Sequence, residues 1–152
     1  MNSKKVNIRR IMREIAFKIL YTLEFSEEIP VENELKEDIR ELLNEYHKGI
    51  ELRNTNIRFA LDIINGVFKN REKFDSYIKE FSDNWDFERI SQVELIILRI
   101  ALYEFLDMEK IPAVVTINEA VELSKSYGDE GSYRFVNGML NSFKVSQGIS
   151  KF

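Results

Sequence analysis

The chain has 152 residues, 44% hydrophobic and 12% aromatic, which is enough for one self-sufficient domain over residues 1–152 with a substantial core. It contains no cysteine, which excludes disulfides, thiolate catalysis and cysteine-based metal sites and favours a cytoplasmic, reducing location. The net charge of −4, from 22 Lys plus Arg against 26 Asp plus Glu, means that any contact with a polyanion must be local. The opening segment also lacks the uniform apolar core of a signal peptide.

The first predicted helix runs from about Lys5 to Phe25 and carries its apolar residues at the three-and-four spacing of one buried face. Beside that face lies a flank that we call the basic-aromatic stripe, made of Arg9, Arg10, Arg13, Phe17 and Tyr21. Guanidinium groups bind phosphates and flat side chains stack on bases, so an accessible stripe of this kind favours single-stranded RNA as the ligand. The alternative is a merely solvated charged face.

Helical patterns continue through the chain, and strand patterns are almost absent. Pro30 and Pro112 lie between periodic segments, where proline marks a helix boundary. The spacing predicts a second, acidic helix from about Val31 to Ile50, a third that begins near Thr55, and a short fourth after a break near Asn70. Gly66 falls inside the third helix, which predicts close approach by another helix or a kink.

The fifth predicted helix differs from the others because residues 93–106 are apolar on nearly every side. Ser91 and Glu94 fit a capping box at its start, and we expect a central, buried helix. Charged residues interrupt the run, which is also too short for a membrane span. One of them, Arg99, requires a carboxylate or carbonyl partner in such surroundings.

Two more helices complete a predicted all-α fold, a compact bundle of about seven helices. Thr116 and Glu119 repeat the capping-box pattern and predict the start of a sixth helix that ends near Tyr127. The seventh runs from about Gly131 to Val145, and Gly128-Asp-Glu-Gly131 is interpreted as the turn between them, since two carboxylates would repel RNA phosphates.

Catalytic and metal-binding patterns are missing from the sequence. His47 is the single histidine and has no second histidine with which to form a metal site. No nucleophile elbow, phosphate-binding loop or dinucleotide fingerprint occurs. We therefore expect a binding protein, with no enzymatic activity, no cofactor and no metal.

The last third of the chain carries four motifs in a fixed order: Leu98-Arg-Ile-Ala-Leu-Tyr-Glu104, Pro112, Ile117-Asn-Glu-Ala-Val-Glu-Leu-Ser-Lys-Ser-Tyr-Gly128 and Phe135-Val-Asn-Gly-Met-Leu140. These motifs give the chain a resemblance to the NusB family of bacterial transcription antitermination factors. The resemblance extends to the first helix, where Arg9-Arg10, Arg13-Glu-x-Ala16 and Leu20-Tyr21 look like the arginine-rich opening of the family. The second helix and the segment from Phe25 to Val31 match least, and Ile11 and Met12 stand where relatives often have basic or small residues.

The resemblance implies two small helical subdomains around a buried central helix, and it implies a function. Members of the family bind the boxA element of nascent ribosomal RNA with NusE, a small-subunit ribosomal protein, and act on the RNA polymerase elongation complex with other Nus factors. By position, Arg9, Arg10 and Arg13 would contact RNA, with Lys18 and Tyr21 at the edge of the same surface. The partner would dock near the start of the central helix, so Gln92 and Glu94 are candidates, although Glu94 has an alternative role in the cap of Ser91.

A second candidate contact surface contains Tyr133 and Arg134, whereas Phe135 is expected in the core with Met139 and Leu140. Asn118 and Asn137 are expected to form hydrogen bonds between helices. Two other functions stay open: a purely protein-binding helical domain, for instance a homodimer that hides the stripe, and a fragment of an rRNA cytosine methyltransferase with a NusB-like domain. The sequence does not decide between monomer and homodimer.

Overall fold

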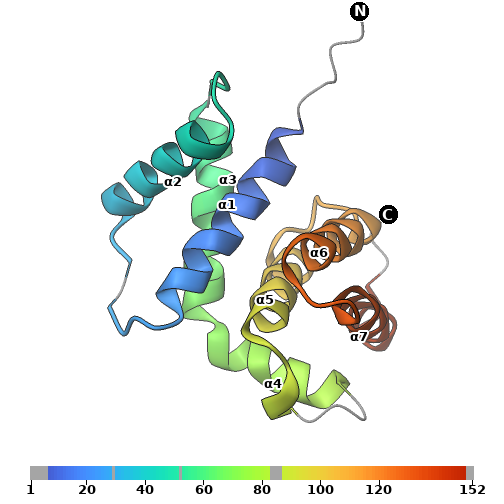
Figure 1. Cartoon of the computed structure of the whole chain (residues 1–152). Helices are drawn as coiled ribbons and strands as arrows, with labels where there is room; N and C mark the ends of the chain where they lie inside the picture. The colour runs from blue at the N-terminus through green and yellow to red at the C-terminus, as the bar shows by residue number, and fades with distance from the viewer. Residues whose placement is uncertain (1–6, 29, 52, 83–86, 150–152) are drawn as a thin grey trace, which may run out of the picture. The chain divides into compact units, whose positions relative to one another are not determined.

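A computed structural model describes residues 7–28, 30–51, 53–82 and 87–149. These residues form seven α-helices and a short 3₁₀ helix and contain no strand, which confirms the predicted all-α class (Figure 1). The predicted helix start near Lys5 lies outside the described residues. In chain order the elements are α1 Ile8–Leu23, α2 Glu32–Tyr46, α3 Asn54–Lys69, α4 Arg71–Phe81, η1 Phe87–Arg89, α5 Gln92–Asp107, α6 Ala113–Tyr127 and α7 Ser132–Ser146.

The chain divides into two compact units, Met1–Asn65 and Gly66–Phe152. The boundary falls inside α3, so this helix contributes its first turns to the amino-terminal unit and its last turn to the carboxy-terminal unit. Two helical units agree with the two small subdomains that the family resemblance implies. The single domain over residues 1–152 stays a prediction.

The amino-terminal unit consists of α1, α2 and most of α3, each of which buries one apolar stripe. Met12, Ala16 and Leu20 line the buried face of α1. The corresponding residues are Leu35, Ile39 and Leu43 in α2, and Ile57, Ala60, Leu61 and Ile64 in α3. The three-and-four spacing of these residues is what makes each segment an amphipathic helix, and burial of the stripes stabilises the unit.

The carboxy-terminal unit is built on α5, which contacts α4, α6 and α7. Ser91 Oγ accepts a hydrogen bond from the Glu94 N–H at 3.1 Å, and the Glu94 carboxylate accepts one from the Ser91 N–H at 2.9 Å. The predicted capping box is thus confirmed, as is the burial of α5. None of the helices in the described part of the chain is both long and apolar enough to span a bilayer.

Arg99 of α5 is buried and has the carboxylate partner that the sequence predicts. Its Nε and its second guanidinium nitrogen each donate to one carboxylate oxygen of Asp75 in α4, both at 2.8 Å. This bidentate pair satisfies the charge that an otherwise apolar helix carries into the core.

Gly66 of α3 lies against the ring of Tyr103 of α5, as the close-approach prediction requires. A Cβ atom built at Gly66 would lie 1.9 Å from Cε1 of Tyr103, far inside van der Waals contact. Any larger residue would displace this ring.

The start of α6 differs from the prediction. The helix begins at Ala113 directly after Pro112, and the Thr116 N–H already donates to the Pro112 carbonyl at 3.2 Å. The expected capping box of Thr116 and Glu119 is therefore wrong. Thr116 is buried instead, and its hydroxyl donates to Glu104 Oε1 of α5 at 3.0 Å. Pro112, whose fixed φ suits the residue before a helix, begins α6 in place of a threonine cap.

The end of the chain agrees with the prediction in its core and differs at one polar residue. α6 ends at Tyr127 with Gly128 at its C-cap, and Phe135, Met139 and Leu140 are buried in α7. Asn137 is exposed and accepts from the Asn141 amide within its own helix, so the expected hydrogen bond between helices is wrong there. Asn118 is also exposed.

Candidate nucleic-acid interface on the first helix

The first turn of α1 presents two exposed arginines, Arg9 and Arg10. Asn7 caps the helix, since its side-chain oxygen accepts from the Arg10 N–H at 3.0 Å. This turn contains no acidic residue, although the positive end of a helix dipole favours acids and disfavours cations. Two arginines at this end are therefore unfavourable for the helix dipole.

Arg9 and Arg13 lie over the same ring, that of Phe59 in α3. The guanidinium carbon of Arg9 is 4.9 Å from the ring centroid and that of Arg13 is 5.2 Å from it. Both contacts are cation–π interactions, which fix the direction of a long side chain. Arg13, however, is only 2% exposed. The expectation that Arg13 lies on an accessible flank is wrong, because it packs on Phe59 within the amino-terminal unit.

Phe17 is 3% exposed, so its expected accessibility is also wrong. Its ring centroid lies 6.4 Å from that of Tyr21, and the Tyr21 centroid lies 6.2 Å from that of Phe25. The three residues are four apart, so they form a ladder along α1 whose buried end is Phe17. Tyr21 and Phe25 are 41% and 78% exposed and present aromatic surface to solvent.

Lys18 is half-buried and lies at the edge of the same helix. Its ammonium is 3.4 Å from the ring centroid of Tyr46 at the end of α2 and 3.8 Å from a carboxylate oxygen of Glu14. Lys18 thus takes part in holding α1 beside α2 and retains partial exposure.

The accessible residues on and beside the stripe form what we call the α1 surface. It consists of Arg9, Arg10 and Tyr21 of the stripe, together with Lys18 and Phe25. From Arg9 to Tyr21 it extends about 18 Å along α1, at a rise of 1.5 Å per residue, and Phe25 follows in the turn after the helix. Arg9 and Arg10 lie at one end, and Lys18 lies beside the exposed rings at the other. Such a surface can pair with phosphates of a single strand and stack on its bases.

The four candidate partner residues form two pairs in the carboxy-terminal unit. Gln92 and Glu94 share the first turn of α5, and Glu94 has the capping role described above. Gln92 Nε2 is buried and lacks a hydrogen-bond partner among the described residues. Tyr133 and Arg134 share the first turn of α7, where Arg134 Nε donates to the Tyr133 hydroxyl at 3.0 Å and the Lys125 ammonium lies 5.4 Å from the Tyr133 ring centroid.

Sequence reasoning did not identify three residues of this site. Phe25 was detectable, because it lies four residues beyond Tyr21 and extends the ladder. Phe59 and Tyr46 were not, since their contacts with Arg9, Arg13 and Lys18 join segments that are far apart in the sequence. His47 is half-buried at the end of α2, and no group of three metal-ligating side chains occurs among the described residues.

Comparison with known proteins finds the same family that the sequence motifs resemble. A model of the NusB family matches residues 10–144. The chain is 43% identical to the transcription antitermination protein NusB of Acetivibrio thermocellus over 87% of this chain and 85% of that protein. It is 36% identical to the protein of the same name from Clostridium acetobutylicum over 88% of this chain and 93% of that one.

Solved structures share the fold. T. maritima NusB superposes with a TM-score of 0.71 at 34% identity, covering 93% of this chain and 90% of that chain. A chain from a crystal structure of the antitermination factors NusB and NusE in complex with dsRNA has a TM-score of 0.69 at 24% identity and covers 93% of this chain and 99% of that chain. At that identity the second likeness establishes the fold alone.

Proposed function

The chain belongs to the NusB family of transcription antitermination proteins, and from this premise we propose that it binds the boxA element of nascent ribosomal RNA transcripts together with NusE. In this role it modifies elongation by RNA polymerase, with other Nus factors, in the cytoplasm where transcripts are made. The family is one of regulators, not enzymes.

One observation carries the RNA assignment: the α1 surface combines exposed arginines at a helix start with exposed aromatic rings. Arg9 and Arg10 supply forked donors for phosphate oxygens. Tyr21 and Phe25 supply stacking surfaces whose affinity does not depend on the base. Arg13 and Phe17 act from beneath, by packing against Phe59 and Tyr21, and so position the exposed residues.

A heterodimer with NusE follows from the small number of cations on this surface. A protein of net charge −4 whose α1 surface carries only three cations binds RNA weakly by itself. A partner that carries its own RNA contacts raises the effective concentration of the strand at α1. Gln92, Glu94, Tyr133 and Arg134 are the residues that we propose for the partner surface. A related solved structure holds NusB and NusE with dsRNA, which supports the choice of partner.

The test is a titration of boxA-like RNA with the full chain, alone and with NusE, for the native protein and the R9E/R10E variant. We expect NusE to raise the affinity of the native protein and the charge reversal to remove most of that gain. Arg13 is left unchanged because it is buried, and its reversal would disturb folding.

The matched control is K73E/K110E, which makes the same change of net charge at two exposed lysines of the carboxy-terminal unit. It separates contact at α1 from the general repulsion of RNA by added negative charge. Equal binding by R9E/R10E and K73E/K110E would remove the RNA role of α1 and favour a domain that binds only proteins.

A further inference from the structure

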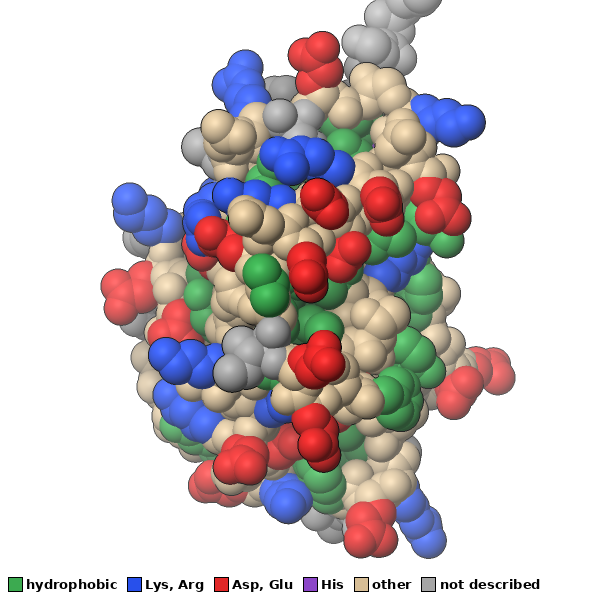
Figure 2. All heavy atoms as spheres, turned by 90° about the vertical axis from the view of Figure 1, so that its left-hand side faces the viewer, with side chains coloured by type: hydrophobic (Ala, Val, Ile, Leu, Met, Phe, Trp, Pro, Cys, Tyr) green, Lys and Arg blue, Asp and Glu red, His purple; other side chains and the backbone are tan. Residues whose placement is uncertain are grey.

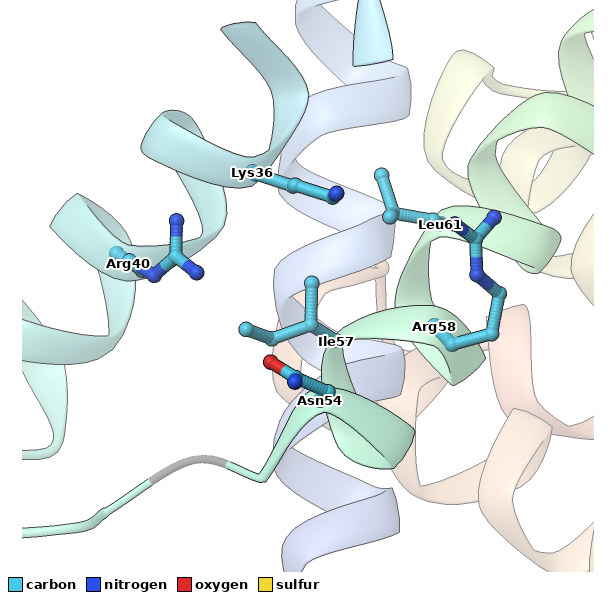
Figure 3. A pocket seen from close by; sticks show the side chains of 6 residues that line it. All are labelled: Lys36, Arg40, Asn54, Ile57, Arg58 and Leu61. Atoms are coloured by element: carbon cyan, nitrogen blue, oxygen red, sulfur yellow. The ribbon is translucent and has the colours of Figure 1, made fainter. Parts of the chain in front are cut away.

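A second group of basic side chains in the amino-terminal unit lines a hollow that contains no residue of the α1 surface. A hollow of about 550 Å³ opens between α2 and α3 (Figure 3). It falls in the size range of small-molecule sites. Its lining consists of Lys36 and Arg40 from α2 and Asn54, Ile57, Arg58 and Leu61 from α3.

The basic residues of α2 line this hollow, whereas its acidic residues do not. The helix carries six acidic residues, Glu32, Glu34, Glu37, Asp38, Glu41 and Glu45, and none of them lines the hollow. Its two basic residues, Lys36 and Arg40, both do, and Figure 3 shows both side chains extending from α2 toward the space between the helices. Like charges four apart on a helix are unfavourable. The hollow nevertheless has the two basic residues of an otherwise acidic helix on its lining.

Arg58 is held in place across the hollow by two carboxylates. One guanidinium nitrogen lies 2.7 Å from Glu32 Oε1 and the other 3.6 Å from Asp62 Oδ1. The hydrogen bond and charge of Arg58 lower the pKa of Glu32, and Glu32 in turn raises the pKa of Arg58. Lys36 and Arg40, by contrast, have no carboxylate within 4.0 Å in the described part of the chain, although the charge of Lys36 also contributes to the lowered pKa of Glu32.

The helix dipole and the floor of the hollow define the ligand further. Asn54 is the first residue of α3, so the positive end of that helix lies at the hollow and favours an anion. Ile57 and Leu61, both buried residues, form an apolar floor. A smaller hollow of about 260 Å³ adjoins it through Arg40, lined also by Leu43, Asn44, His47, Gly49 and Ile50.

From these observations we propose that the hollow between α2 and α3 binds a nucleoside phosphate. Lys36 and Arg40 contact the phosphate oxygens, and Asn54 offers an amide to the base or ribose. The shared chemistry is a phosphate joined to a ribose and to a base that carries hydrogen-bond donors and acceptors. It can come from a free nucleotide or from a nucleotide of an RNA strand. The surface around α2 mixes acidic and basic side chains closely (Figure 2), so recognition depends on the hollow and not on a broad positive field.

The experiment titrates the full chain with adenosine 5′-monophosphate, and separately with adenosine and with inorganic phosphate, by calorimetry and by backbone amide shifts. We expect the nucleotide to bind more tightly than either fragment, with the largest shifts at Lys36, Arg40, Asn54 and Ile57. K36Q/R40Q should weaken binding at least about tenfold, which corresponds to about 1.4 kcal/mol. Removal of the like-charge pair should leave the fold intact, which circular dichroism checks.

The matched control is K73Q/R89Q, which removes two exposed cations from the carboxy-terminal unit and should bind the nucleotide like the native chain. A second arm repeats the titration with a short RNA oligonucleotide in the R9E/R10E background, so the α1 surface does not contribute. If K36Q/R40Q weakens binding in either arm, the site is supported and the arm identifies the source of the phosphate. Unchanged binding in both arms would overturn it, and the proposed role of α1 would be unaffected.

Discussion

Two glycines in helices of the same unit show how much one residue position depends on its surroundings. Gly66 in α3 lies under the ring of Tyr103, whereas Gly138 in α7 has nothing within 4 Å of the place that a Cβ atom would occupy. Glycine in a helix is unfavourable at both positions by its propensity. The difference is therefore one of packing. The close approach of Tyr103 explains why residue 66 is a glycine, whereas nothing packs against Gly138 that would require one there.

We expect Gly66→Ala to destabilise the protein and Gly138→Ala to stabilise it. At Gly66 three ring atoms of Tyr103 lie within 2.5 Å of the added methyl, so overpacking should cost about 1–3 kcal/mol. At Gly138 the gain in helix propensity should contribute about 0.5–1 kcal/mol. Urea unfolding of the two variants and the native chain measures both effects. A stabilised Gly66→Ala variant would contradict the role of the Tyr103 contact.

Single residues also mark the limit of what the sequence predicts about the site. A helical wheel places Arg13 and Phe17 at the edge of the buried face of α1, where a rotation of a few tens of degrees decides exposure. Arg13 is buried because Phe59, 46 positions further on, packs under its guanidinium. Periodicity within α1 contains no information about that partner. Exposure of Arg10 and Tyr21, which lie further from the edge, and of Arg9, which lies in the first turn of the helix, was predicted correctly.

Between elements, the pair of Arg99 and Asp75 joins α5 to α4 with two hydrogen bonds from one guanidinium. Arg99 is 4% exposed, so its charge depends on this partner. A lysine in its place would keep the charge and lose the planar fork.

We expect Asp75→Ala to destabilise the carboxy-terminal unit by about 3–5 kcal/mol, because it leaves a buried guanidinium without its carboxylate. Arg99→Met in the Asp75→Ala background should recover part of that loss, since the uncompensated charge is removed and methionine fills most of the space. Thermal unfolding of the two variants gives the comparison. The matched control is Glu122→Ala, which breaks the exposed pair with Lys125 and should have little effect. A double variant less stable than Asp75→Ala would contradict this account.

Element boundaries were predictable where the local signal acts alone. The capping box of Ser91 and Glu94 involves only residues of one turn, and α5 begins where it predicts. Thr116 and Glu119 have the same spacing, but Pro112 begins α6 one turn earlier and Thr116 is used for a hydrogen bond to Glu104 of α5. A cap motif is therefore a reliable start only where no stronger signal precedes it within a turn.

At the scale of the whole molecule, overall charge and local charge oppose each other. The chain carries a net charge of −4, yet α1 begins with two exposed arginines and the hollow between α2 and α3 is lined by three cations. The composition predicts that any polyanion contact is local, and both the residue spacing of the first helix and the family resemblance predict α1 as its place. The hollow was not predicted, because it exists only when α2 and α3 pack together.

The salt dependence of RNA binding follows from the number of accessible cations on the α1 surface. Arg9, Arg10 and Lys18 can neutralise about three phosphates, and a single strand contributes a slope of about −0.7 per phosphate, so log K should fall with log salt at a slope of about −2. Raising salt tenfold should then weaken binding by the chain alone about a hundredfold. Filter-binding titrations over a salt series measure this slope, and R9E/R10E, which leaves only Lys18 on this surface, should reduce it to about −0.7. A native slope much steeper than −2 would mean that RNA contacts many cations outside the α1 surface, and a flat one would mean that it pairs with none.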